Sequence, residues 1–326
     1  MTAVPDIPQV SEAPGGREGR ILCLMRNVRQ LERSTAFYET RLGFVRCGPP
    51  QRLDAALAGL WSPTHRPLDR QRLRLGASEL DLVGVGAAGA APYPDDSRAD
   101  DLWFQHFAIR CPDIEQAFLR LYRPEPAVPV PRALSGSSSC GGDGAPGPVV
   151  LPARSGGVTA FKFRDPDGHP VELLGFPARS GVAPDASPPG IDHSAISVSN
   201  VANSIAFYRR WLGFTVDARQ WNVGVEQDRL DGLQGVRVDV VALRSPSGCA
   251  PHLELLGYDR APGSGPPRVP AASSPCDVVS DRLVVRVADL DALRHAWLAA
   301  ALPVEASTPD ALLVRDPDRH LLMLTR

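Results

Sequence analysis

The sequence predicts an α+β protein of four tandem modules, each with the element order βαβββ. Two different internal repeats support this. Ser34 to Phe44 (STAFYETRLGF) and Ser204 to Phe214 (SIAFYRRWLGF) share seven of eleven positions, 170 residues apart. Phe163 to Leu174 (FRDPDGHPVELL) and Val314 to Thr325 (VRDPDRHLLMLT) share six of twelve, 151 residues apart. Because self-similarity at a fixed spacing indicates duplication, each half of the chain contains two unlike modules.

Each module opens with a short apolar stretch that predicts a strand followed by a helix. The four stretches are Ile21–Met25, Trp103–Ile109, Ile191–Val198 and Arg282–Val287. Apolar residues then recur near helical spacing, and Gly43 and Gly213 end the helices of modules one and three. The aromatic residues of these two helices are expected in the core. They are Phe37, Tyr38, Phe207 and Tyr208.

Each module also closes with a strand. The closing segments are Glu79–Val85, Pro170–Phe176, His252–Gly257 and His320–Leu324. An Asp-Pro-Asp run precedes two of them and predicts a turn, because proline presets φ. His169 and His320 follow that turn in both halves, so we interpret them as structural turn residues. The remaining histidines, His65, His252 and His295, are interpreted as surface or supporting residues.

Segments rich in Pro, Gly, Ala and Ser divide the chain. We predict a disordered tail at 1–19, a first domain at 20–178 (modules 20–86 and 102–178), a linker at 179–189 and a second domain at 190–326 (modules 190–260 and 278–326). A low-complexity insert occupies 124–157 of the second module. A loop of that length is either a lid or a disordered segment.

Composition limits the classes of partner. With 35 basic and 37 acidic residues the net charge is −2, which favours neither a nucleic acid nor an anionic membrane as partner. No stretch approaches the ~18 apolar residues of a membrane helix, and 1–19 lacks the apolar run of a signal peptide. The six cysteines are scattered without a C-x-x-C pair, so a reduced, cytoplasmic setting is expected. Both a monomer and a homodimer are compatible with the duplication.

Single carboxylates within apolar strands mark a candidate site. Glu172 lies in PVELL and Glu254 in HLELL, and burying a lone carboxylate is costly unless it is paired, protonated or bound to a metal. His106 and His193 lie in apolar opening strands. Two imidazoles and two carboxylates suit a divalent metal such as Zn, Ni, Co, Mn or Fe(II). Taken singly, such a histidine or glutamate is more often a satisfied core residue or an arginine partner.

The four-module pattern, the A-F-Y-x-x-x-L-G-F helix end and the R-D-P-D-G-H-P-V-E-L-L strand resemble the vicinal oxygen chelate superfamily. That group contains glyoxalase I, extradiol dioxygenases, bleomycin-resistance proteins and methylmalonyl-CoA epimerase. The resemblance covers the chain from about Arg20 onward. It implies modules paired into two cup-shaped half-barrel sheets, with metal ligands on the first and last strands of paired modules. The matching residues, in module order, are Cys23 and Asp81, His106 and Glu172, His193 and Glu254, and Arg282 and Met323.

Module pairing decides which site forms. Pairing two with three and one with four, as in duplicated single-chain glyoxalases, gives one complete site of His106, Glu172, His193 and Glu254 and one degenerate pocket. Sequential pairing, as in extradiol dioxygenases, would instead combine Cys23 and Asp81 with His106 and Glu172. We favour the first arrangement because it explains all four retained residues at once.

The resemblance implies a metal-dependent, glyoxalase-like lyase or isomerase that acts on a small oxygenated organic substrate through an enediolate-type intermediate. Glu172 or Glu254 would be the catalytic base. Two alternatives are an Fe(II)-dependent extradiol-type dioxygenase and a metal-free binding protein like the bleomycin-resistance members. The last usually lacks the His/Glu set.

Overall fold

A computed structural model of the chain describes residues 18–61, 67–86, 90–134, 146–177, 189–260, 266–269 and 273–326. Nearly all of the predicted tail and linker, the middle of the predicted insert, and His65 therefore lie outside the described residues. None of the helices within these ranges has the length and apolarity needed to cross a membrane.

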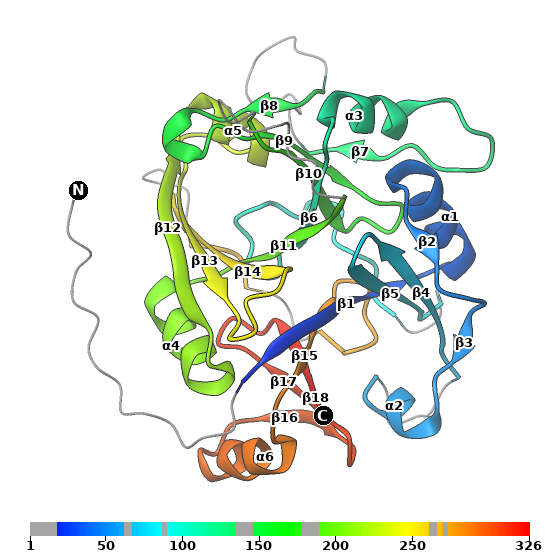
Figure 1. Cartoon of the computed structure of the whole chain (residues 1–326), viewed down its shortest axis with the longest axis vertical. Helices are drawn as coiled ribbons and strands as arrows, with labels where there is room; N and C mark the ends of the chain where they lie inside the picture. The colour runs from blue at the N-terminus through cyan, green and yellow to red at the C-terminus, as the bar shows by residue number, and fades with distance from the viewer. Residues whose placement is uncertain are drawn as a thin grey trace.

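Two nine-stranded sheets make up the body of the protein (Figure 1). The first has the order β16-β17-β18-β15-β1-β5-β4-β2, with β3 beside β4, and the second the order β12-β13-β14-β11-β6-β10-β9-β7, with β8 beside β9. The strands of the first are β1 (Arg20–Val28), β2 (Val45–Arg46), β3 (Gln51–Arg52), β4 (Asp69–Leu75), β5 (Ser78–Gly84), β15 (Arg282–Arg286), β16 (Val304–Ser307), β17 (Ala311–Arg315) and β18 (Leu321–Thr325). Those of the second are β6 (Gln105–Arg110), β7 (Arg132–Ala133), β8 (Val149–Val150), β9 (Thr159–Arg164), β10 (Pro170–Gly175), β11 (Gly190–Ser197), β12 (Thr215–Val223), β13 (Arg237–Arg244) and β14 (His252–Asp259).

The sheets confirm the α+β fold class and the favoured module pairing. The first sheet joins modules one and four, and the second joins modules two and three. Modules three and four keep the βαβββ order, with α5 (Val225–Asp231) added in module three. Modules one and two each have one extra short strand after the helix, β3 and β8, together with α2 (Ala55–Gly59) and the 3₁₀ turn η2 (Ala153–Ser155) respectively.

The four longer helices begin and end largely as their sequences predict. They are α1 (Leu31–Leu42), α3 (Ile114–Tyr122), α4 (Val201–Leu212) and α6 (Leu290–Ala299). The side chains of Asp113, Asn200 and Asp289 cap α3, α4 and α6, whereas Gln30 at the start of α1 makes no side-chain cap. Gly43 and Gly213 end α1 and α4 with φ of 78° and 71°, a conformation that glycine adopts without a Cβ penalty.

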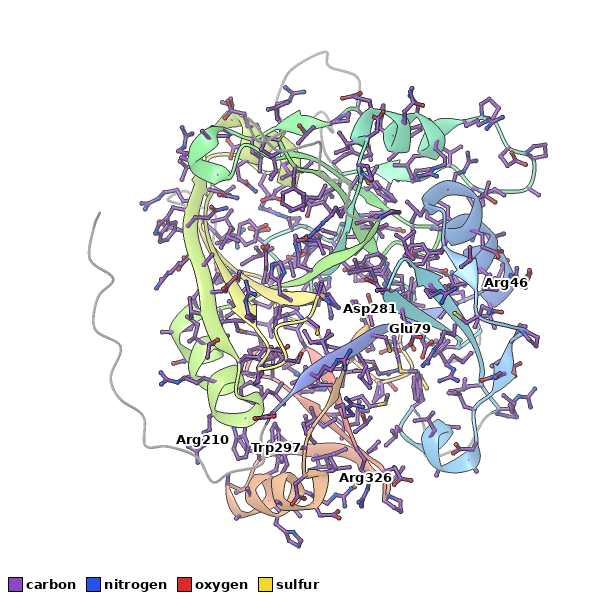
Figure 2. The ribbon with its side chains drawn as sticks, viewed as in Figure 1. Arg46, Glu79, Arg210, Asp281, Trp297 and Arg326 are labelled. Atoms are coloured by element: carbon purple, nitrogen blue, oxygen red, sulfur yellow. The ribbon has the colours of Figure 1, made fainter. Side chains whose placement is uncertain are left out.

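Helices pack within each half of the chain, although strands pair across the halves. Arg41 of α1 donates to the carbonyl oxygens of Arg120 and Val128, which belong to α3 and the segment after it. The ring centroids of Trp297 in α6 and Trp211 in α4 are 4.8 Å apart, and Figure 2 shows Trp297 where α6 meets α4. Phe37, Tyr38 and Tyr208 are buried and Phe207 packs on the same core, as predicted.

The turn histidines join the two sheets. His169 Nε2 lies 2.9 Å from the carbonyl oxygen of Asn27 in β1, and its backbone N–H donates to Asp165 within the turn. His320 repeats this arrangement with the carbonyl oxygen of Ser197 in β11, also at 2.9 Å. The structural role predicted for both residues is confirmed, and the bonds show that each turn anchors to the opposite sheet.

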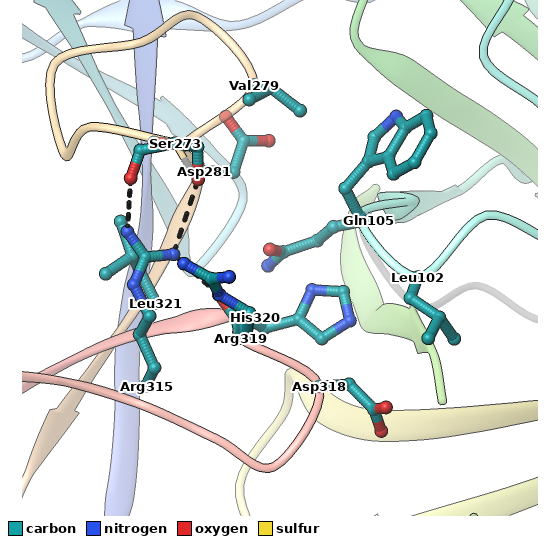
Figure 3. A pocket seen from close by; sticks show the side chains of 12 residues that line it. Leu102, Gln105, Ser273, Val279, Asp281, Arg315, Asp318, Arg319, His320 and Leu321 are labelled. Carbon is teal, nitrogen blue, oxygen red and sulfur yellow. Dashed lines mark hydrogen bonds between the residues drawn. The ribbon is translucent and has the colours of Figure 1, made fainter. Parts of the chain in front are cut away.

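Tyrosine and aspartate complete each of these anchors. Tyr38 Oη donates to Asp165 at 2.6 Å, and Tyr208 Oη donates to Asp316 at 2.9 Å. The two recurring sequence motifs thus meet, since each tyrosine comes from the helix repeat and each aspartate from the turn repeat. Beside His320 lies a cavity of about 20 Å³ (Figure 3), with room for about one water molecule, lined in part by Gln105 and Asp281.

Candidate metal centre

The strand register places the four ligand candidates at equivalent points. Glu172 lies opposite Ala108, two residues after His106, and Glu254 lies opposite Ala195, two residues after His193. In the antiparallel pair that joins the modules, His106 faces Ala195 and Ala108 faces His193. Because side chains two apart on a strand share a face, all four candidates project from one face of the second sheet.

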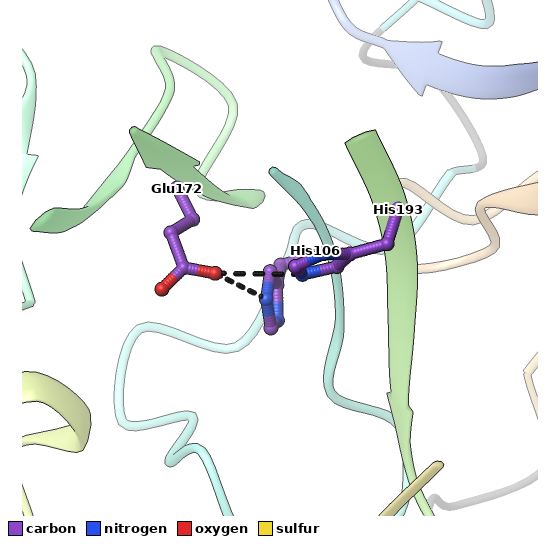
Figure 4. Close-up of side chains that lie close together, drawn as sticks. All are labelled: His106, Glu172 and His193. Atoms are coloured by element: carbon purple, nitrogen blue, oxygen red, sulfur yellow. Dashed lines mark hydrogen bonds and ion pairs between the residues drawn. The ribbon is translucent and has the colours of Figure 1, made fainter. Parts of the chain in front are cut away.

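The carboxylate of Glu172 contacts both imidazoles from one side (Figure 4). Its Oε2 is 3.0 Å from His106 Nε2 and 3.6 Å from His193 Nε2. Glu254 also approaches this nitrogen, with its Oε2 3.6 Å from His193 Nε2. The structure therefore brings His106, Glu172 and His193 into one compact group and places Glu254 beside it.

The donor set fits a divalent metal ion. Ligand atoms bound at about 2.1 Å to one ion lie about 3.0 to 3.4 Å apart, close to the separations given above. His193 Nε2 is buried and has no hydrogen-bond partner within the described residues, although a buried polar nitrogen is normally satisfied. An ion held between these donors would satisfy it.

A β-bulge supports one of the histidines. The register of β11 shifts between Ile191 and His193, which lets neighbouring side chains turn to the same side. Asp192 Oδ2 then lies 3.1 Å from His193 Nδ1, and Arg110 donates to the other carboxylate oxygen, Oδ1, at 2.6 Å. A carboxylate on the far nitrogen of a metal-binding histidine fixes its tautomer and orientation.

The only lysine of the chain lies beside the centre. Lys162 is opposite Glu172 in β9 and is almost fully buried. Its Nζ lies 2.6 Å from Asp231 Oδ1 of α5, whose other oxygen accepts hydrogen bonds from Gln227 and Tyr258. This network ties α5 of module three to β9 of module two, next to the metal ligands.

The surrounding charges keep the candidate ligands in their metal-binding forms. Burial alone would raise the pKa of Glu172, but the Lys162 ammonium, the hydrogen bond with His106 and the nearby His193 hold that pKa well below its usual range. Burial and the same ammonium lower the pKa of His106, which favours its neutral form. Burial also acts against the charge of Glu254, yet His193 and then His252 lower its pKa.

His193 is the exception, because carboxylates surround it. Burial would lower its pKa, but Glu254, Asp192 and Glu172 together raise it well above the ordinary value. Carboxylate oxygens lie near both ring nitrogens of His193 and favour positive charge at this point.

The equivalent positions of the first sheet are used for packing. Asp81 is held by Arg72 through contacts of 2.8 and 2.9 Å, and the Arg282 guanidinium lies 3.9 Å from the centre of the Trp61 ring. Cys23 and Met323 belong to a buried apolar cluster, and burial raises the pKa of the Cys23 thiol. The pocket of modules one and four is degenerate, as predicted.

The alternative site, in which Cys23 and Asp81 join His106 and Glu172, is wrong. Those two pairs of residues lie in different sheets, because β1 pairs with β15 of module four rather than with β6. Sequential pairing is excluded for the same reason.

Sequence reasoning missed the supporting residues. Asp192 and Lys162 carry no signal of their own, although an Asp-His dipeptide in an opening strand is a usable clue. His252, interpreted as a surface or supporting residue, lies 3.4 Å from Glu254 Oε1 and is half-buried. His295 is exposed on α6, as expected.

Comparison with known proteins agrees with this architecture. Glyoxalase I from Zea mays superposes with a TM-score of 0.57 at 16% identity, over 94% of this chain and 92% of that chain. A putative dioxygenase from Bacillus subtilis superposes with a TM-score of 0.51 at 13% identity, over 94% and 84% of the two chains. In sequence, no family model and no curated protein matches.

These likenesses show that the chain has the vicinal oxygen chelate fold, which confirms the resemblance noted in the sequence. Both neighbours carry the names of enzymes. At 13 to 16% identity the likeness establishes the fold only, and the reaction has to be inferred from the residues of the site.

Proposed function

We propose that the protein is a metal-dependent enzyme of the glyoxalase type, a lyase or isomerase that acts on a small oxygenated organic molecule. The observation that carries this proposal is the group formed by His106, Glu172 and His193, with Glu254 beside it, on strands contributed by two modules. A purely structural ion pair would not need two histidines and two glutamates to converge on one buried point.

In this proposal His106, Glu172, His193 and Glu254 hold the ion, and Asp192 orients His193. Zn, Ni, Co, Mn and Fe(II) all suit imidazole and carboxylate ligands. A bound divalent metal supplies Lewis acidity to the oxygens of a substrate. The protein's own contribution is a preorganised, largely buried cup, and the catalytic proton carrier is Glu172 or Glu254.

The exposures of the two glutamates differ. The side chain of Glu172 is 7% exposed and that of Glu254 is 20% exposed. Glu254 also contacts the half-buried His252, which gives it a neighbour for proton exchange with solvent. Both glutamates remain candidates for the proton carrier, because both lie within 3.6 Å of His193 Nε2 in the same group.

A dioxygenase is the second candidate, and one observation favours it. The compact group consists of two histidines and one carboxylate, the set that non-haem Fe(II) oxygenases use, with open positions for substrate and O₂. In that case Glu254 would act near the metal without binding it.

Metal content per chain, by elemental analysis, tests the proposal. About one metal per chain in wild type, lost or weakened in His106→Ala, Glu172→Ala, His193→Ala and Glu254→Ala, is the expected result. Cys23→Ala, at the position equivalent to His106 in the other sheet, is the matched control and should retain the metal. Equal loss in the control, or no metal in wild type under any loading condition, would overturn the proposal.

The Glu254 variant separates the two enzyme classes. Lost metal in Glu254→Ala supports four protein ligands and the lyase or isomerase. Full retention of Fe(II), together with oxygen consumption by the wild type on catechol substrates, supports the dioxygenase. The monomeric or homodimeric state and the cytoplasmic setting stay predictions.

A further inference from the structure

A second polar concavity lies away from the metal centre. It is a groove of about 540 Å³, formed by the start of α1, the segments at 92–95 and 129–132, and the turn between β9 and β10. That volume is within the range of small-molecule sites. None of the four metal-ligand candidates lines it.

Four arginines line the groove. They are Arg29, Arg33, Arg132 and Arg164. The first three are exposed, and their side chains make no hydrogen bond or ion pair within the part of the chain that the structure describes. The buried Arg164 donates to the carbonyl oxygens of Gly168 and Ser97, which are neutral acceptors. Among the described residues, none of these four guanidinium groups therefore forms an ion pair with a carboxylate.

Two of these arginines lie directly opposite each other. Arg132 of β7 is the cross-strand partner of Arg164 in β9, and like charges in this arrangement destabilise a sheet. Arg164 is buried, so water screens the repulsion poorly. Burial and the charge of Arg132 lower the pKa of Arg164, despite the opposing effect of Tyr93. The repulsion between Arg132 and Arg164 lies at the wall of a groove, where a bound anion would reduce it.

The carboxylates of the groove do not supply that anion. Asp165 accepts hydrogen bonds from Tyr38 and Arg26 as well as from two backbone N–H groups. Asp167 accepts from Ser34 Oγ and from the backbone N–H of Arg29. Asp95 is exposed and offsets one positive charge of the lining.

The start of α1 adds to the positive potential. It is the one longer helix without a side-chain cap among those described, and its N-cap residue Gln30 lines the groove with Arg29 and Arg33. The positive end of the helix dipole therefore lies on the same wall as two arginines.

We propose that this groove binds a small polyanion, a molecule with two or more phosphate or carboxylate groups. Guanidinium forks match the geometry of both groups. The groove contains none of the metal-ligand candidates, so an experiment on the groove tests this proposal separately from the proposed function.

Calorimetric titration of the full-length protein with inorganic pyrophosphate tests it. Arg29→Gln, Arg33→Gln and Arg132→Gln are combined in one triple variant. The control triple combines Arg20→Gln, Arg74→Gln and Arg286→Gln. Its three arginines are exposed and lie outside the groove, and Arg20 and Arg286 are likewise a directly opposite cross-strand pair. The two variants lose the same charge.

We expect wild type and control to bind one pyrophosphate with similar affinity, and the groove variant to bind about tenfold or more weakly. His193→Ala is a further arm, because pyrophosphate also binds metals, and it should keep wild-type affinity. Parallel titrations with citrate distinguish carboxylate from phosphate as the preferred group.

Three results would overturn the proposal. They are no binding of pyrophosphate or citrate by wild type, equal weakening in the control, and loss of binding in His193→Ala. A fall of more than about 5 °C in the Tm of the groove variant would also overturn it. That fall would show a structural role for the arginines, whereas relief of like-charge repulsion predicts a Tm no lower than that of wild type.

Discussion

Replacing Lys162 by Met removes one partner of a buried ion pair and tests how α5 is held against the second sheet. The Nζ of Lys162 and Oδ1 of Asp231 are 2.6 Å apart, with side chains 5% and 0% exposed. Coulomb's law at an effective dielectric constant of ~20 gives an attraction of about 6 kcal/mol at that distance. Desolvation of both charges offsets part of this, and removal of one partner from such pairs costs about 3 to 5 kcal/mol. We therefore expect Lys162→Met to lower the free energy of unfolding by about 3 to 5 kcal/mol.

Equilibrium unfolding in urea, monitored by far-UV circular dichroism, measures this loss. The double variant Lys162→Met with Asp231→Asn is the control, because it also removes the uncompensated carboxylate while Gln227 and Tyr258 keep a hydrogen-bonding partner. We expect the double variant to regain a substantial part of the stability. A single variant within about 1 kcal/mol of wild type would refute the reasoning, as would a double variant less stable than the single one.

Three further outcomes are expected. Asp192→Asn should weaken metal affinity by about 10- to 100-fold, measured by competition with a chelator, because His193 loses the carboxylate on its far nitrogen; unchanged affinity would contradict this. Burial raises the pKa of Asp316 above its ordinary value, so the stability linked to this carboxyl is greatest at low pH and falls as the pH rises through the raised pKa. Asp316→Asn should flatten that part of the Tm profile, at pH values above the ordinary pKa of an aspartic acid, and an unchanged slope would contradict it. His169→Ala and His320→Ala should each cost about 1 to 3 kcal/mol through a lost hydrogen bond between the sheets, measured by urea unfolding; His295→Ala, exposed on α6, is the matched control and should cost less than about 0.5 kcal/mol.

The modules were predictable because their signals are local. The glycines that end α1 and α4, the Asp-Pro-Asp turns and the alternation around Glu172 each reflect a conformation set within a few residues. Once modules two and three are paired, a period of two along the strands is enough to bring His106, Glu172, His193 and Glu254 to one face.

The residues that support the metal centre and the contacts between the two sheets depend on tertiary structure, which no local sequence pattern records. The bulge that turns Asp192 toward His193 depends on the pairing of β11 with β6, and no residue type marks it. Lys162 gains its position from the register of β9 and its partner from α5, 69 residues further along the chain. The roles of His169 and His320 were predictable only as turns, since the carbonyl groups that they contact lie on the other sheet.

The exchange of strands between the two halves has a consequence for how the protein is made. β1 pairs with β5 on one side and with β15 on the other. The edge that pairs with β15 therefore has no partner until roughly 250 further residues have left the ribosome, which takes on the order of tens of seconds at about 5 to 20 residues per second. During that time β1 presents a strand edge able to pair with other chains, and β6 waits similarly, for a shorter time, for β11. Neither half can complete a sheet alone, so we expect fragments cut between them to recover the native sheets only when both are present. The two halves therefore form one cooperative unit, because module four supplies the strand that pairs with β1 of module one.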